Sequence, residues 1–141
     1  MKKILDNLII TGAPGWFDVT DELEVGAPFT LARSDGFGAL QFSLATYKSG
    51  QVPAIGLDQL RQLLADFGFS REFGRGFDHK EVCGPLMVCA ESFKTGQQFV
   101  RVWYCSGGRD IVLATYVCER GREGNELVDC ENMIQGLTFV S

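Results

Sequence analysis

The sequence predicts an α+β domain in which a mainly antiparallel sheet is covered on both of its faces. The first observation is a meander of three strand-like runs, at residues 86–93, 99–105 and 111–118, joined by short turns that contain glycine. Glycine adopts the positive φ of tight hairpin turns without steric cost, so these turns favour antiparallel pairing. The second observation is a pair of amphipathic helical segments that could supply covering layers. A length of 141 residues, 45% of them apolar, fits one globular domain, which we assign to residues 1–141.

Both faces of the meander are apolar, which is the third observation. A tight turn at Gly107 and Gly108 would place Tyr104 opposite Ile111, and in that register one face is apolar along its length. The other face carries Phe99, Arg101, Trp103, Val112, Ala114 and Tyr116. Neither face suits water, and a sheet of this kind needs a layer on each side.

The chain before the meander contains four strand-like runs. They lie at residues 7–11, 16–19, 29–33 and 40–47. In the last run Leu40, Phe42 and Leu44 alternate with smaller or polar residues, which is the period of two expected of a strand. The turn-forming residues between the third and fourth runs predict a hairpin.

A helix is predicted between these strands and the meander. A loop at residues 48–56 precedes it, and Gly68 is its expected end. Its apolar stripe consists of Leu57, Leu60, Leu64 and Phe67. This spacing is typical of a helix that buries one side.

The end of the chain predicts a second helix and a final strand. Residues 70–81 show no regular pattern. Asn125 is a suitable N-cap for a helix, whose apolar stripe consists of Leu127, Cys130, Ile134 and Leu137. Residues 137–140 then predict the closing strand.

Charge restricts the classes of partner. The formal net charge is −5, and no basic run is longer than Lys2-Lys3, so we predict that the chain does not bind nucleic acid. No apolar stretch approaches the length of a membrane span or of a secretory signal, so we predict no membrane association. Acidic residues gather at residues 18–24 and 119–131, where they form either a solvated face or a docking surface for a basic partner.

The cysteines predict a reducing environment. The five are Cys83, Cys89, Cys105, Cys118 and Cys130, an odd number with no C-x-x-C pair. The register above places Cys105 opposite Asp110 and Cys118 near Gln97, so neither meets another cysteine across the meander. We therefore predict reduced thiols and a cytoplasmic location.

The candidate chemical motifs are weak. Residues 12–15 lack the G-K-[ST] ending of a phosphate loop, and residues 35–38 predict a turn. His79 is the only histidine and has no evident nucleophile, so we predict no catalytic residue, no metal and no cofactor. A cleft near His79 and Arg75 that holds a small ligand or a substrate is the alternative.

Two segments are candidates for partner binding. The loop at residues 69–77 is punctuated by glycine and contains Phe69, Phe73, Arg75 and Phe77, which either plug a sheet edge or present anchors to a protein partner. The second segment combines Trp16, which looks exposed in the sequence, with the acidic residues Asp21 and Glu22.

The chain resembles the PsbP-like superfamily in the order of its motifs. These motifs are Pro14-Gly15-Trp16, residues 38–43, the amphipathic helix, Trp103-Tyr104, residues 115–118 and Leu137-Thr138-Phe139. The resemblance implies an α-β-α sandwich with a mainly antiparallel sheet flanked by helices on both faces. It also implies protein binding without a shared enzymatic activity, and one member binds the small GTPase Ran.

The resulting prediction is a non-catalytic, cytosolic protein-binding domain. The chain also looks like small bacterial proteins of this fold that neutralise toxins, so the predicted partner is a basic toxin domain and the predicted role is that of an immunity protein. A homodimeric structural protein is a further alternative.

Overall fold

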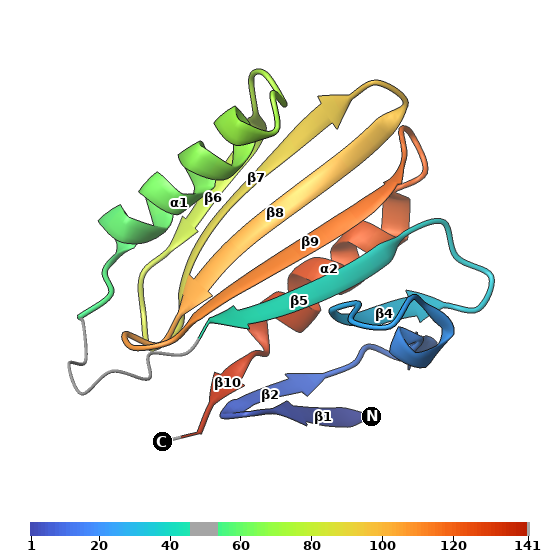
Figure 1. Ribbon diagram of the computed structural model, residues 1–141, viewed down its shortest axis with the longest axis horizontal. Helices are drawn as coiled ribbons and strands as arrows, with labels where there is room; N and C mark the ends of the chain where they lie inside the picture. The colour runs from blue at the N-terminus through green and yellow to red at the C-terminus, as the bar shows by residue number, and fades with distance from the viewer. Residues whose placement is uncertain (46–53, 141) are drawn as a thin grey trace.

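The computed structural model of the chain describes residues 1–45 and 54–140, so most of the predicted loop at residues 48–56 and the end of the run 40–47 lie outside the described residues. The described chain forms two sheets (Figure 1). The larger sheet has seven strands, in the spatial order β3 (Trp16–Asp18), β4 (Phe29–Arg33), β5 (Ala39–Ala45), β9 (Ile111–Glu119), β8 (Gln98–Ser106), β7 (Met87–Thr95) and β6 (Phe77–Val82). The smaller sheet consists of β1 (Lys2–Leu5), β2 (Leu8–Thr11) and β10 (Thr138–Phe139). All neighbouring strands are antiparallel.

The meander forms as predicted, but its last hairpin is shifted in register by two residues. Ser106 pairs with Ile111, so Tyr104 lies opposite Leu113. The connecting loop spans residues 107–110 and is longer than a two-residue turn; within it, Asp110 is buried and accepts a hydrogen bond from the Asn7 side chain. A shift of two leaves every side chain on its predicted face.

The same shift changes the cysteine neighbours. Cys105 lies opposite Val112, and Cys118 lies opposite Phe99, so the predicted pairings with Asp110 and Gln97 are wrong. In the part of the chain that the structure describes, all five cysteines are free thiols.

Helix α1 (Leu57–Ser70) lies on one face of the large sheet, against β7 and β8 (Figure 1). Gln59 accepts a hydrogen bond from the backbone N–H of Gly56 at 2.9 Å, which caps the first turn. The helix does not end at Gly68. That glycine is buried, and a Cβ there would lie 3.3 Å from the Phe93 ring, so its small size serves close packing.

The opposite face is covered by helix α2 (Gly124–Gln135) together with the small sheet. Cys130, Met133 and Ile134 of α2 share one buried cluster with Trp103 and Tyr116 of the large sheet. Leu8 and Ile10 of β2 belong to the same cluster. Asn125 lies inside α2 and makes no capping hydrogen bond, so its predicted role as N-cap is wrong.

The predicted α-β-α sandwich, with helices flanking both faces, is also wrong. The described residues contain ten strands and only two α-helices, so this is a sheet-rich fold. Neither face carries a layer of helices: one holds the single helix α1, and the other holds α2 beside a second sheet (Figure 1). Strands β1 and β6 were not predicted from the sequence, because neither has a regular alternation of apolar residues.

Candidate functional site

The face of the large sheet that carries α1 is only partly covered. Helix α1 packs on β7 and β8, and leaves the neighbouring strands β9 and β5 uncovered by any described helix (Figure 1). We call this region the open face and define it by Gln41, Ser43, Leu113, Thr115 and Val117. The β9 members are half-buried, whereas the β9 side chains that point the other way are buried.

The open face is hollowed next to α1. A hollow of about 330 Å³ lies between the five side chains of the open face and three residues at the C-terminal end of α1 and just beyond it, namely Phe67, Arg71 and Phe73. The Arg71 guanidinium lies 3.6 Å from the centre of the Phe67 ring. The Phe73 ring lies 5.9 Å from that ring, and 5.2 Å from the ring of Phe93. Aromatic rings therefore form one wall of the hollow.

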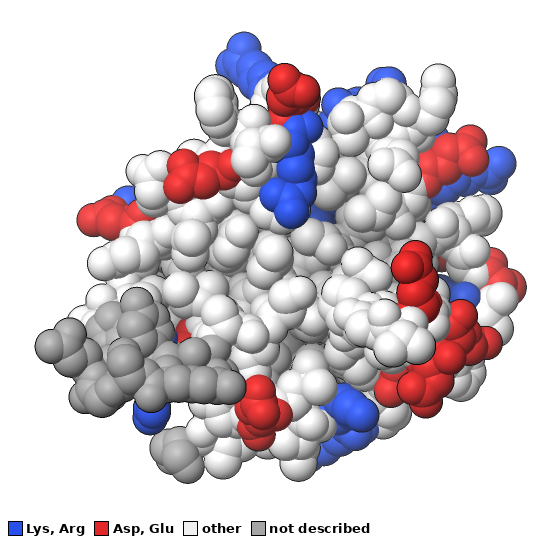
Figure 2. Space-filling view, in the orientation of Figure 1, with Lys and Arg blue, Asp and Glu red and all other residues white. Residues whose placement is uncertain are grey.

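The open face carries no ionisable side chain. Figure 2 shows the corresponding area over β8, β9 and β5 as a broad surface without charged residues, with the charged side chains around it. The open face is therefore uncharged and of mixed polarity, with Leu113 and Val117 apolar and Gln41, Ser43 and Thr115 polar.

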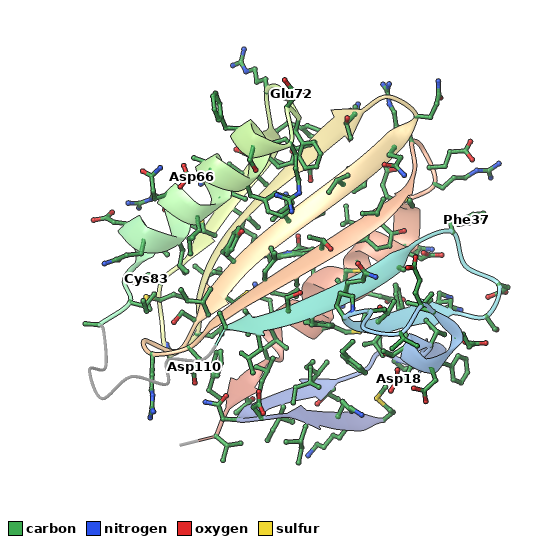
Figure 3. All side chains as sticks on the ribbon, viewed as in Figure 1. Asp18, Phe37, Asp66, Glu72, Cys83 and Asp110 are labelled. Carbon is green, nitrogen blue, oxygen red and sulfur yellow. The ribbon has the colours of Figure 1, made fainter. Side chains whose placement is uncertain are left out.

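An acidic segment flanks this surface. Asp18, Asp21, Glu22 and Glu24 are all exposed, and Asp21 and Glu22 belong to the short 3₁₀ helix η1 (Thr20–Glu22). Hydrogen bonds from the hydroxyl and the N–H of Thr20 hold the pKa of Asp18 below its ordinary value. Figure 2 shows a group of acidic side chains in this area, near the position of Asp18 labelled in Figure 3. The segment therefore places negative charge at the border of the open face.

A second hollow, of about 750 Å³, lies on the other side of the C-terminal half of α1. It is lined in part by Leu64, Gly68, Phe69 and Phe93. The side chain of Phe69 is 87% exposed, more than any other described phenylalanine. The sequence marks it as part of the phenylalanine-rich loop at residues 69–77, but the structure places it inside α1.

Trp16 does not form part of an exposed site. It is only 3% exposed, and its Nε1–H donates a hydrogen bond to Oδ2 of Asp129 on α2 at 2.9 Å. The prediction that Trp16 is exposed is therefore wrong; the exposed ring is that of Phe17, at 55%. Asp21 and Glu22 are exposed as expected.

The remaining candidates do not form one surface. Phe73 packs on the α1 side, whereas Phe77 is half-buried on the α2 side with its ring centre 6.2 Å from that of Phe99. Arg75 is exposed between them. The two phenylalanines thus plug opposite sides of the sheet near the β6 edge, and a role for these residues in partner binding stays a prediction.

His79 lies in a cluster of polar side chains at the β6–β7 edge. Its Nδ1 is 3.2 Å from Oε1 of Glu91, and its Nε2 is 2.7 Å from Oε2 of Glu81. Arg61 of α1 donates two hydrogen bonds to Glu81, at 2.8 and 2.7 Å. These bonds, with that of His79, lower the pKa of Glu81 to about 2.

The cluster differs from the predicted cleft. Neither His79 nor Arg75 lines either hollow beside α1. The third member of the cluster is the buried thiol of Cys89, whose Sγ lies 4.0 Å from Oε2 of Glu81. Burial, and to a smaller extent the Glu81 carboxylate, raise the pKa of that thiol to about 11.

Comparisons with known proteins identify the fold. No protein-family model and no curated protein sequence matches the chain. The solved structures that resemble it include a solution structure of cyanobacterial PsbP (CyanoP) from Synechocystis sp. PCC 6803, with a TM-score of 0.62 and 8% identity over 95% of this chain and 87% of that one. A crystal structure from Bacteroides thetaiotaomicron VPI-5482 gives a TM-score of 0.63 and 15% identity over 96% of this chain.

These matches show the fold alone. The chain has a PsbP-like fold, which confirms that part of the predicted resemblance. It spans about half the length of the Bacteroides chain, of which it covers 46%. Separately, no helix in the described part of the chain is long and apolar enough to cross a membrane.

Proposed function

We propose that this chain is a non-catalytic protein-binding domain whose open face contacts a basic protein partner. The observation that carries the proposal is the combination of an uncharged, partly exposed sheet surface with an acidic segment at its border. Protein interfaces commonly have a centre depleted in charged residues and a polar rim. The open face matches the centre, and Asp21 and Glu22 match the rim.

The shape of the open face favours a protein over a small ligand. Small-ligand sites bury most of their ligand and aim a few polar groups at it. Here apolar and aromatic side chains are mixed with the polar side chains of Gln41, Ser43, Arg71, Gln98 and Thr115, on a part of the sheet that no described helix covers. A side chain that projects from a partner would fill such a hollow, while the rest of the partner covers the surrounding strands.

The narrower form of the proposal is an immunity protein that neutralises a cognate toxin in the bacterial cytoplasm. It is supported by the net charge of −5, since an acidic protein attracts a basic toxin domain at long range. Thiols that stay reduced fit the same compartment.

Affinity capture from cells of the native host tests the proposal. The wild-type chain is compared with Thr115→Glu, which places a charge on the open face, and with Val128→Glu, which places the same charge on the exposed side of α2. We expect a basic protein to bind the wild type and Val128→Glu, and not Thr115→Glu. A partner that binds all three chains equally, or a second copy of the chain in its place, would contradict the proposal.

A further inference from the structure

We propose that His79, Glu81 and Cys89 bind a single zinc ion at the β6–β7 edge. This site lies apart from the open face, and the inference does not depend on the proposed function. Imidazole nitrogen, carboxylate oxygen and thiolate sulfur are the ligands that zinc prefers.

Strand pairing brings the three side chains together. Glu81 lies directly opposite Cys89 in the β6–β7 pair, and residues opposite each other in a sheet place their side chains on the same face. A β-bulge between Phe77 and Lys80 interrupts the register, and Asp78 within it adopts a φ of +52°. His79 lies two residues before Glu81 in β6, and residues two apart in a strand place their side chains on the same face.

The three ligand atoms are close enough to surround one ion. The imidazole nitrogen, the carboxylate oxygen and the sulfur all lie within 4.8 Å of one another. The distance from Nε2 of His79 to Oε2 of Glu81 is 2.7 Å. A water molecule would complete a four-coordinate shell, since His79 and Glu81 are open to solvent.

Both ring nitrogens of His79 lie beside a carboxylate, an arrangement that suits a zinc-binding histidine. A neutral imidazole has one N–H, and both of its nitrogens here face a carboxylate oxygen. If Nδ1–H donates to Glu91, the lone pair of Nε2 points toward Oε2 of Glu81, where a zinc ion would bridge the two atoms. A carboxylate on the far nitrogen is also the usual partner of a zinc-binding histidine.

Arg61 acts as a competitor for the same carboxylate. Its Nε donates to Oε2 of Glu81 and its Nη2 donates to Oε1. Zinc binding would release Oε2 from Nε and leave the Nη2 bond in place. The Cys89 thiol would lose its proton to solvent and bind as thiolate.

Titration of the purified, reduced chain with Co²⁺ tests the site, because cobalt replaces zinc and reports a thiolate ligand by its charge-transfer absorption. We expect one Co²⁺ per chain, a thiolate band, and displacement by Zn²⁺. Cys89→Ser should abolish the band, and His79→Ala should weaken binding by roughly tenfold or more. Arg61→Gln should tighten binding because it removes the competing charge.

Cys83→Ser is the matched control, since Cys83 is the exposed cysteine, and it should leave the band unchanged. Absence of saturable binding would overturn the proposal. So would a band that survives Cys89→Ser or depends on Cys83, or binding that His79→Ala does not weaken.

Discussion

The hydroxyl of Tyr116 donates a hydrogen bond to Oε1 of Glu126 at 2.9 Å, and this bond joins the centre of the large sheet to helix α2. Glu126 is only 7% exposed. The same carboxylate accepts the backbone N–H groups of Phe37 at 2.8 Å and Gly38 at 3.1 Å. One side chain thus fixes three segments that are distant in the sequence: β9, α2 and the turn before β5.

Replacement of Glu126 by alanine should destabilise the fold. The substitution leaves the Tyr116 hydroxyl and two backbone donors without their acceptor, and each hydrogen bond to a charged group contributes about 1.5–3 kcal/mol. We expect a loss of at least that amount in the free energy of unfolding, measured by urea denaturation. Glu24→Ala, at an exposed position, is the control and should change it by less than about 0.5 kcal/mol. Equal effects of the two substitutions would show that the network is not a determinant of stability.

Truncation of Leu64 tests the packing of α1. Leu64 is 3% exposed and lies in a cluster with Leu60, Phe93 and Val102. Leu64→Ala should lower the free energy of unfolding by about 2–5 kcal/mol, the usual range for a buried leucine. Gln62→Ala, on the exposed side of the same helix, is the control. A loss below about 0.5 kcal/mol for Leu64→Ala would mean that this side of α1 does not pack on the sheet.

The thiols should differ sharply in reactivity. Cys83 is exposed, whereas the other four cysteines are buried, and burial raises the pKa of the thiols of Cys89, Cys105, Cys118 and Cys130. Because the thiolate is the reactive form, alkylation of the native protein should label Cys83 alone. After denaturation without a reductant, mass spectrometry should show five labels. Unlabelled cysteines, with a mass lower by about two units per bridge, would reveal disulfides.

The acidic segment should act on the rate of association with the proposed partner. Charges at the rim of an interface steer the encounter, while buried contacts hold the complex. Asp21→Lys combined with Glu22→Lys should slow association and weaken its dependence on salt, with little change in dissociation. Surface binding at two ionic strengths separates the rates. Association that responds neither to salt nor to the reversal would make the acidic segment a determinant of solubility alone.

Local sequence patterns predicted the helices and strands whose apolar residues recur at a regular spacing. The leucines of α1 and the three strands of the meander were predicted because their periodicity is set by neighbours in the sequence. The register of the last hairpin was not predicted, because the sequence did not show that Asp110 stays in the loop, buried and bonded to Asn7, which is 103 residues away. Strand β6 was missed for a related reason: its residues are mainly polar, and pairing with β7 defines it.

The candidate site was largely beyond prediction from the sequence. Leu113, Thr115 and Val117 follow the alternation of a buried strand, and nothing local shows that α1 stops short of covering them. Trp16 was misassigned because its partner, Asp129, comes from the other end of the chain. The exposure of the open face thus depends on how much of the sheet α1 covers, and that is a property of the assembled fold.

Site-specific photo-crosslinking tests the central claim, that the open face contacts a protein partner, most directly. A photoreactive amino acid is placed at position 115 on the open face, or at position 128 on the exposed side of α2. After illumination in native host cells, crosslinked products are identified by mass spectrometry. We predict that position 115 gives a discrete adduct with one basic protein and that position 128 gives none. Adducts with that protein from position 128 alone, or no adduct from position 115, would contradict the claim.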